Sequence, residues 1–233
     1  MKKELTTCGE IELSKKVLAA ISDMGFEEPS PIQSKTIPLV LAGNDVIGQA
    51  QTGTGKTAAF GIPAIEKVDD HNKHIQALIL TPTRELAIQI SEEITKIGKF
   101  KKVKSLPIYG GQSIDRQIKA LKSGVQVVIG TPGRLLDHIR RRTIKLDQVK
   151  MLILDEATSS IDTRTESIVQ RGMDNLMKGR TVFVIAHRLS TIRNSDAIIV
   201  LEHGKIIERG DHEDLIKNKG TYYQLYTGKL ELS

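Results

Sequence analysis

The chain has 233 residues, a net charge of +6, and ordinary proportions of hydrophobic (39%) and charged (27%) residues, so it can form one large α/β domain or two small ones. Aromatic residues make up only 3%, with no tryptophan, which disfavours nucleic-acid binding on an aromatic stacking platform. The single cysteine, Cys8, excludes an internal disulfide, and no apolar run approaches the ~18 residues that a membrane span requires.

Strand-like and helix-like patterns alternate along the chain. Short apolar and β-branched runs predict strands over 45–50, 76–82, 104–110, 125–132, 150–156, 181–187 and 197–210. The last run contains the turn sequence EHGK and therefore predicts a hairpin. Amphipathic patterns predict helices over 83–98 and 164–179. Together they predict a three-layer α/β fold in a single domain, with a mostly parallel central sheet and a C-terminal β-hairpin plus helix.

The excess of positive charge collects in two basic clusters, 99–104 (KFKKVK) and 140–142 (RRR). Runs of this kind attract a phosphate backbone, but in isolation they more often form solvated surface. Both interpretations stay open from the sequence alone.

The clearest chemical signal is AQTGTGKT, residues 50–57, which directly follows a predicted strand. Glycines let the backbone curl so that N–H groups point at phosphate oxygens, and the following helix adds its positive N-terminal end. The lysine would reach the β- and γ-phosphates, and the last threonine would bind Mg²⁺. Ala50 replaces the first glycine of the general pattern. The predicted nucleotide-binding residues of this loop are Gln51, Thr52, Gly53, Thr54, Gly55, Lys56 and Thr57.

Asp155 and Glu156 follow the buried run MLIL and would complete such a site. An aspartate at the carboxyl end of a strand can hold Mg²⁺, usually through water, and the next carboxylate can orient and deprotonate the attacking water. Two acidic residues after a strand are more often a charge preference at a helix start. Because a phosphate loop precedes them, the catalytic interpretation is preferred.

Several motifs resemble those of the DEAD-box RNA helicases. They are GFEEPSPIQ (25–33), AQTGTGKT with its leading alanine, PTRELA (82–87), GG (110–111), TPGR (131–134) and DEA (155–157). The resemblance covers residues 1–157 and implies a RecA-like P-loop NTPase domain. It implies that Gln33 hydrogen-bonds the adenine edge and that Phe26 packs nearby. The RNA contacts that it implies are Pro82, Thr83, Arg84, Gly110, Gly111, Thr131 and Arg134.

The resemblance ends at Thr158, which stands where the family has aspartate, and the Ser-Ala-Thr motif expected after the next strand is absent. Residues 152–226 instead resemble the C-terminal part of an exporter-type ABC transporter ATPase domain. The matching sequences are LILDEATSSID (152–162) and the long run from Gly179 through IAHRLSTIR to DHEDLI. This second resemblance implies that His187 contacts the γ-phosphate.

The ABC-like part is also incomplete, since its phosphate loop, stacking aromatic, Q-loop and LSGGQ signature do not appear. LKSGVQ (121–126) resembles that signature but precedes a predicted strand, whereas the signature opens a helix, so we reject the match. We also reject HRLSTIR (187–193) as a helicase HRxGRxxR motif, because it lacks the glycine and the middle arginine.

The two resemblances meet at LDEA, which suggests an engineered or recombined chimera of two P-loop ATPases. The join is physically reasonable because, in both families, the strand ending in Asp155 is followed by a helix and a further parallel strand. The helix over 164–179 would then repack on a helicase sheet. Its expected core residues are Ile168, Met173, Leu176 and Met177.

The functional expectation is a monomeric, cytoplasmic, Mg-ATP-binding domain whose hydrolysis is slow or undetectable, with Lys56, Glu156 and His187 as catalytic residues. The rate is expected to be low because a closing partner that brings an arginine finger contributes on the order of 10³–10⁵ in related NTPases. One alternative is a weak RNA-binding module inherited from the helicase half. Another is a hybrid that was made to test whether folds recombine and that has no selected activity. Helicase and transport activity are not expected of the domain by itself.

Overall fold

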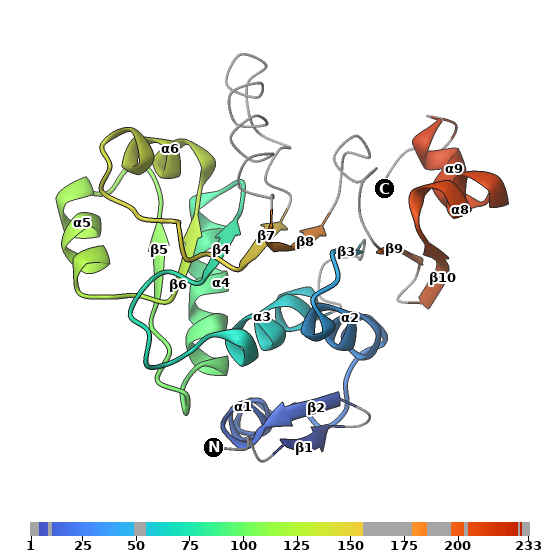
Figure 1. The fold of residues 1–233 in the computed structure, drawn as a ribbon, viewed down its shortest axis with the longest axis horizontal. Coiled ribbons are helices and arrows are strands. Elements are labelled where there is room, and N and C mark those ends of the chain that lie inside the picture. The colour runs from blue at the N-terminus through green and yellow to red at the C-terminus, as the bar shows by residue number, and fades with distance from the viewer. Residues whose placement is uncertain are drawn as a thin grey trace.

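A computed structural model describes residues 5–8, 11–48, 55–155, 179–185, 197–202, 205–227 and 229 (Figure 1). The chain order of their helices and strands is β1 (Leu5–Cys8), β2 (Ile11–Ser14), α1 (Lys15–Asp23), α2 (Pro31–Ala42), β3 (Val46–Gly48), α3 (Lys56–Lys67), β4 (Ala77–Leu80), α4 (Arg84–Ile97), β5 (Ser105–Ile108), α5 (Ile114–Lys122), β6 (Val127–Gly130), α6 (Pro132–Arg140), β7 (Met151–Asp155), β8 (Thr181–Ile185), β9 (Ala197–Glu202), β10 (Lys205–Gly210), α8 (His212–Asn218) and α9 (Thr221–Tyr226).

The central sheet has eight strands in the order β10-β9-β3-β8-β7-β4-β6-β5. All neighbouring pairs are parallel except β9 and β10, which form the antiparallel hairpin predicted at 197–210. Each of the seven predicted strand regions contains a strand, and every one of them belongs to this sheet. The predicted α/β class with a mostly parallel sheet is therefore confirmed.

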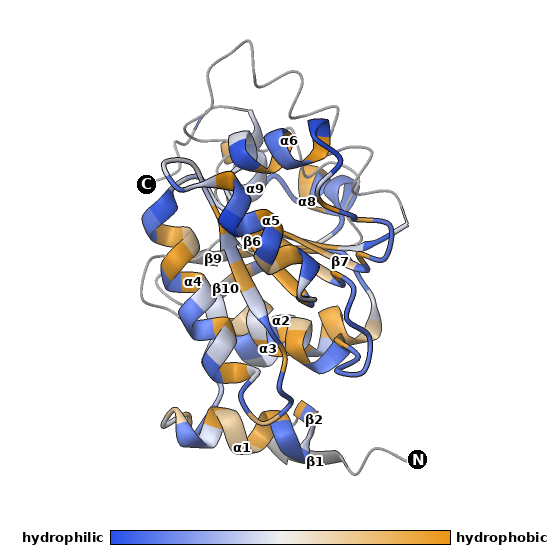
Figure 2. Cartoon of the chain, turned by 90° about the vertical axis from the view of Figure 1, so that its left-hand side faces the viewer, coloured by the Kyte–Doolittle hydropathy of each residue, from blue (hydrophilic) through white to orange (hydrophobic). Residues whose placement is uncertain are grey.

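Side chains alternate between the two faces of the sheet, as the two-residue period of a strand requires. One face packs against α2, α3 and α4 and includes Ile79, Ile153, Phe183 and Ile199. The other face includes their neighbours Leu78, Leu152, Val182 and Ile198, together with residues of α6, α8 and α9. Figure 2 shows this apolar interior, in orange, along the central strands. Burial on both faces explains why these strands read as continuous apolar runs.

A short N-terminal hairpin, formed by β1 and β2, lies below α2 and α3 in Figure 1 and was not predicted. Ile11 and Leu13 of β2 are buried in the same cluster as α2 and α3. The Ser14 backbone N–H and hydroxyl both donate to the Glu66 carboxylate, at 3.1 and 2.7 Å. Four-residue strands with mixed polarity give little sequence signal, because their stability comes from these tertiary contacts.

The basic cluster at 99–104 has a structural role that its sequence did not indicate. Lys101 is only 5% exposed. Its ammonium group donates to the carbonyl oxygens of Ile65, Glu66 and Val68 at 2.8, 2.9 and 2.5 Å, which satisfies the carboxyl end of α3. Lys99 pairs with Asp23 at 2.6 Å. Lys101 therefore stabilises the fold, contrary to either surface interpretation, whereas Lys99, Lys102 and Lys104 are exposed, as a surface cluster requires.

The predicted helix at 164–179, with its expected core residues Ile168, Met173, Leu176 and Met177, lies outside the described residues apart from Gly179. LKSGVQ spans the end of α5 and the loop before β6, which agrees with rejecting it as a helix-opening signature. Within the part of the chain that the structure describes, every helix is too short or too polar to span a bilayer.

Candidate functional site

The end of the predicted phosphate loop leads directly into α3. Gly55 is the N-cap of this helix, with φ of +83°, and Lys56 and Thr57 form its first turn. A Cβ atom at Gly55 would lie 2.5 Å from Nε2 of Gln33, so both the backbone conformation and the close approach require glycine here. The first N–H groups of α3 have no partner within the helix and suit an anion. Gln51, Thr52, Gly53 and Thr54 lie outside the described residues.

Gln33 connects the start of α2 to this loop. Its side-chain carbonyl accepts from the Ser30 backbone N–H at 3.0 Å, which forms one half of a capping box at the N-terminus of α2. Its amide nitrogen donates to the Gly55 carbonyl at 3.2 Å. The side chain is 3% exposed. The residue predicted to read adenine is therefore already held against the phosphate loop.

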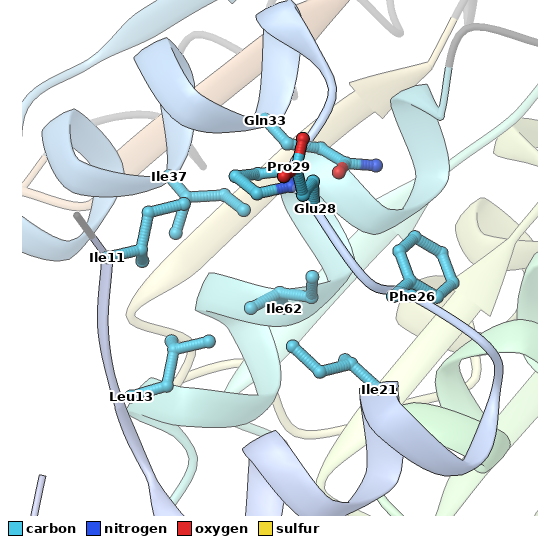
Figure 3. Close-up of a pocket in the computed structure, with 9 residues that line it drawn as sticks. All are labelled: Ile11, Leu13, Ile21, Phe26, Glu28, Pro29, Gln33, Ile37 and Ile62. Atoms are coloured by element: carbon cyan, nitrogen blue, oxygen red, sulfur yellow. The ribbon is translucent and has the colours of Figure 1, made fainter. Parts of the chain in front are cut away.

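Phe26 and Gln33 line the same small hollow, whose volume is only about 10 Å³ (Figure 3). The hollow lies among β2, α1, α2 and α3, and its other lining residues are Ile11, Leu13, Ile21, Glu28, Pro29, Ile37 and Ile62. Most of these side chains are aliphatic. Phe26 and Gln33 thus border a gap in the apolar core with room for about one water molecule, and the base-binding role of this corner stays a prediction.

Asp155 ends β7 and is 7% exposed, in register with Ile185 of the adjacent β8. The carboxyl ends of these parallel strands and the start of α3 lie at the same edge of the sheet (Figure 1). A carboxylate from Asp155 and a hydroxyl from Thr57 are hard oxygen donors that suit Mg²⁺. Glu156 and His187 lie outside the described residues.

The fit to magnesium rests on few protein ligands. Among the described residues, no group of three or more His, Cys, Asp or Glu side chains is arranged to hold a metal ion. Mg²⁺ at nucleotide sites normally takes one or two protein ligands and completes its shell with phosphate oxygens and water. Asp155 and Thr57 match that sparse pattern rather than a metal cage built only from protein.

Glu93 of α4 is a further acidic residue at this site that no motif in the sequence indicated. Its carboxylate accepts a hydrogen bond from the Thr57 side chain. Burial raises the pKa of Glu93, and this hydrogen bond and the nearby Lys96 partly oppose the rise. A half-buried glutamate on an amphipathic helix looks like ordinary surface in sequence, so only the packing of α4 against α3 reveals its contact.

The residues predicted to contact RNA lie on three loops at the same edge of the sheet. Pro82, Thr83 and Arg84 follow β4; Gly110 and Gly111 follow β5; Thr131 and Arg134 follow β6. Since β4, β6 and β5 are adjacent parallel strands, their carboxyl ends bring these loops together. The Arg84 guanidinium lies over the Tyr109 ring at 5.0 Å, which links the first loop to the second.

A buried glutamine on α5, Gln117, ties these loops to one another. Its amide nitrogen donates to the Tyr109 carbonyl at 3.1 Å and to Oε1 of Gln112 at 3.0 Å. Its side-chain oxygen interacts with Nη1 of Arg134 at 3.1 Å and with Nε2 of His138 at 3.0 Å. Arg134 also donates to the Gln112 carbonyl at 2.9 Å. The Arg134 side chain is thus directed largely at the neighbouring loop.

His138 completes this network from α6 and is fully buried. Burial and the nearby Arg134 lower its pKa, so the ring is neutral at pH 7. Since the Gln117 oxygen is an acceptor, we assign the proton to Nε2 of His138. Nδ1 then accepts from the Thr143 hydroxyl at 2.8 Å. Neither Gln117 nor His138 belongs to a motif that the sequence analysis identified, because their importance depends on partners from other elements.

Comparisons with known proteins agree with this arrangement. The sequence profile of the family described as "DEAD/DEAH box helicase" matches residues 30–187. The chain is 60% identical over 158 residues to the DEAD-box ATP-dependent RNA helicase CshA of Geobacillus kaustophilus, and 58% identical over 156 residues to that of Bacillus subtilis. These matches cover 68% and 67% of the chain but only 34% and 32% of the relatives.

Solved structures show the same fold. A DEAD box protein from Methanococcus jannaschii superposes with a TM-score of 0.72 at 43% identity, covering 81% of this chain and 51% of that protein. Saccharomyces cerevisiae Dbp5 bound to RNA and ADP BeF3 superposes with a TM-score of 0.71 at 30% identity, covering 82% and 50%. The chain therefore spans about a third of its curated relatives and half of these structures. On the family profile, which covers more than half of its residues, the chain belongs to the DEAD/DEAH box helicase family.

Proposed function

We propose that this chain binds Mg-ATP, with the adenine at Gln33 and Phe26 and the phosphates at the start of α3. The observation that carries the proposal is the pair of hydrogen bonds by which Gln33 joins Ser30 to Gly55. One side chain thereby connects the base-binding corner to the phosphate loop. The curated relatives are named ATP-dependent, which is consistent with this assignment.

The hydrogen-bonding capacity of Gln33 suits adenine. A side-chain amide can donate twice and accept twice. Among the described residues, Gln33 uses one donor on Gly55 and one acceptor position on Ser30. One donor and one acceptor position remain, which is the complement of the adenine edge formed by N7 and the N6 amino group. Guanine presents two acceptors at that edge, so the site should prefer ATP to GTP.

The phosphate end of the proposed site uses residues of the loop and of β7. Lys56 would neutralise the β- and γ-phosphates, and Thr57 and Asp155 would hold Mg²⁺, which supplies charge stabilisation when bound. Glu156 would orient and deprotonate the attacking water, and His187 would contact the γ-phosphate. Hydrolysis by residues 1–233 alone is proposed to be slow or absent, since most of the length of the helicase relatives has no counterpart in them.

A titration with a fluorescent ATP analogue tests the nucleotide proposal. The folded protein should bind it, Lys56→Ala should weaken binding by at least about tenfold, and Gln33→Ala should lower the preference for ATP over GTP. Ser30→Ala serves as the control for Gln33, since it perturbs the same cap without removing the amide. Absence of ATP and ADP binding by folded protein would refute the proposal.

Weak RNA binding is a second proposed function, supported by the convergence of the loops after β4, β5 and β6. The contacts would involve Pro82, Thr83, Arg84, Gly110, Gly111, Thr131 and Arg134. A solved relative is bound to RNA. Titration of single-stranded RNA at about 50 mM and about 200 mM salt should show weak binding that falls steeply with salt. Absence of RNA binding at about 50 mM salt would refute RNA binding as a function.

We further propose that 1–233 is one hybrid domain, helicase-like over 1–157 and ABC ATPase-like over 158–233. The match to the curated relative covers 68% of the chain and leaves about a third of it without a counterpart there, while the family profile ends at residue 187. Such a hybrid would be monomeric and cytoplasmic, and it would carry no helicase or transport activity by itself. Sequencing the source gene distinguishes a natural fusion from a hybrid with no selected activity, and analytical ultracentrifugation tests the monomer.

A further inference from the structure

A basic cleft lies at the edge of the sheet opposite the candidate site. It has a volume of about 530 Å³, is open to solvent, and is lined by Lys73, His74, Ile75, Ile118, Leu121, Lys122, Val125, Arg142, Thr143, Ile144 and Lys145. Ile75 precedes β4 and Val125 precedes β6, so the cleft borders the amino ends of these strands. The loops with the nucleotide and RNA motifs follow the carboxyl ends, and the cleft is therefore separate from them.

The lining of the cleft divides into an aliphatic floor and a basic rim. Ile75, Val125 and Ile144 are buried, and Ile118 and Leu121 are half-buried beside them. Lys73, Lys122, Arg142 and Lys145 are exposed around this floor, together with His74. Among the described residues that line the cleft, none is aspartate or glutamate. Within the described part of the chain, none of the four Lys and Arg side chains forms an ion pair.

The rim is held in place by the local backbone. The Lys73 side chain packs against the turn at Gly124, where an added Cβ would lie 3.1 Å from the Cβ of Lys73 and φ is +86°. Arg142 has φ of +53°, in the left-handed region, and its N–H donates to the Ile139 carbonyl at 2.9 Å. Thr143 is hydrogen-bonded to the buried His138. The cleft is thus formed by ordered turns on both sides.

We propose that this cleft binds an acidic, aliphatic peptide segment of a partner protein. The rim charges, which form no ion pair with the described residues, complement carboxylates, and the apolar floor accepts aliphatic side chains between them. A single-stranded nucleic acid fits the cleft less well, because its bases stack on aromatic rings and the lining offers none apart from the His74 imidazole. The volume is comparable with that of pockets that enclose a ligand of several side chains.

A fluorescein-labelled decapeptide of alternating glutamate and leucine is a direct probe, measured by fluorescence anisotropy on the full chain. It should bind at about 50 mM salt and more weakly at about 200 mM. A decapeptide of alternating glutamate and serine, with the same charge, should bind at least about tenfold more weakly. Equal binding of the two peptides would overturn the role of the apolar floor.

Arg142→Gly is the sharpest variant, because it removes a rim charge at a position where glycine relieves the left-handed backbone. Peptide affinity should fall about two- to fivefold while thermal stability is kept or increased. Lys219→Gly is the matched control: Lys219 also has positive φ, at 51°, but caps α8 away from the cleft. It removes the same charge and should leave peptide affinity unchanged.

The double variant Lys122→Glu/Lys145→Glu should lower affinity at least about tenfold, compared with the charge-matched Lys35→Glu/Lys217→Glu, which lies outside the cleft. Methyl resonances of Ile118, Val125 and Ile144 should shift on peptide addition. An equal loss in both double variants, or unchanged methyl resonances, would overturn the proposal. So would a uridine decanucleotide that binds more tightly than the peptide and depends on the same residues.

Discussion

Two buried glutamines organise the two halves of the candidate site in different ways. Gln33 is 3% exposed and makes two side-chain hydrogen bonds to other described residues, which leaves half of its capacity. Gln117 is 2% exposed and makes four, which uses all of it. A buried amide with remaining hydrogen-bonding capacity can recognise a ligand, whereas an amide whose donors and acceptors are all used can only position its neighbours.

The largest expected effect comes from removing the saturated glutamine. Gln117→Leu removes one hydrogen bond each from the Tyr109 carbonyl, the Arg134 guanidinium and the His138 ring, so the free energy of unfolding should fall by about 2–4 kcal/mol. Urea unfolding measures the loss. Gln33→Leu removes two hydrogen bonds rather than four and should cost about 1–2 kcal/mol. Equal losses in the two variants would break the comparison.

The second-largest expected loss of stability comes from a variant that disturbs the contact between Gln33 and the phosphate loop. Gly55→Ala places a methyl group 2.5 Å from Nε2 of Gln33 at a φ of +83°, so it should destabilise the protein by about 1–3 kcal/mol. In the background of Gln33→Ala the steric part disappears and only the backbone cost remains. A double-mutant cycle in urea should therefore give a coupling of at least about 0.5 kcal/mol. If the losses in unfolding free energy of the two single variants simply add in the double variant, the two residues act independently.

A variant with a smaller expected loss of stability distinguishes the capping role of Gln33 from its proposed recognition of adenine. Ser30→Ala removes the N-cap hydroxyl of α2 and should lower the free energy of unfolding by about 0.5–2 kcal/mol. The Gln33 amide and its bond to Gly55 are retained, so the preference for ATP over GTP should persist. Competition binding with both nucleotides measures it. Loss of the preference in Ser30→Ala would assign it to the cap rather than to the amide.

The smallest expected effect is a pH dependence confined to the Gln117 network. Burial lowers the pKa of His138 below its ordinary value of 6.5, and the charges that face it are Arg134, Asp137 and Arg141. The unfolded chain therefore takes up this proton first as the pH falls. The associated stability is complete above pH 6.5 and is lost progressively below it. His138→Gln should flatten the unfolding free energy between pH 7 and pH 5 relative to wild type. An unchanged slope would exclude a neutral, buried His138.

The strands were predictable because their signal is local. Burial on both faces makes β4, β6 and β7 continuous apolar runs, and the EHGK turn marked the β9–β10 hairpin. The N-terminal hairpin was missed because Ile11 and Leu13 are stabilised by α2 and α3, far away in sequence. Lys101 looked like surface charge for the same reason, since its three carbonyl partners lie more than thirty residues earlier.

The residues of the candidate site also fall into a group that local sequence motifs predicted and a group that only the packing revealed. Gly55, Lys56, Thr57, Asp155 and Gln33 belong to motifs whose spacing is visible in the sequence, and the strand ends place them at one edge of the sheet. Glu93, Gln117 and His138 were not predictable, because single polar residues on amphipathic helices resemble ordinary surface positions. The roles of Glu156 and His187 stay predictions from motif resemblance alone.

By itself the sequence determined the α/β class, the strand regions, the phosphate-loop motif and the family, because each depends on neighbouring residues in the chain. Only the tertiary structure decided that Gln33 makes fewer hydrogen bonds to the described residues than Gln117, that Lys101 is structural, and that a basic cleft forms at the opposite edge of the sheet. The physical reason is that burial and hydrogen-bond partners are set between elements. Residues 76 positions apart, such as Asp23 and Lys99, meet only once the sheet and helices pack.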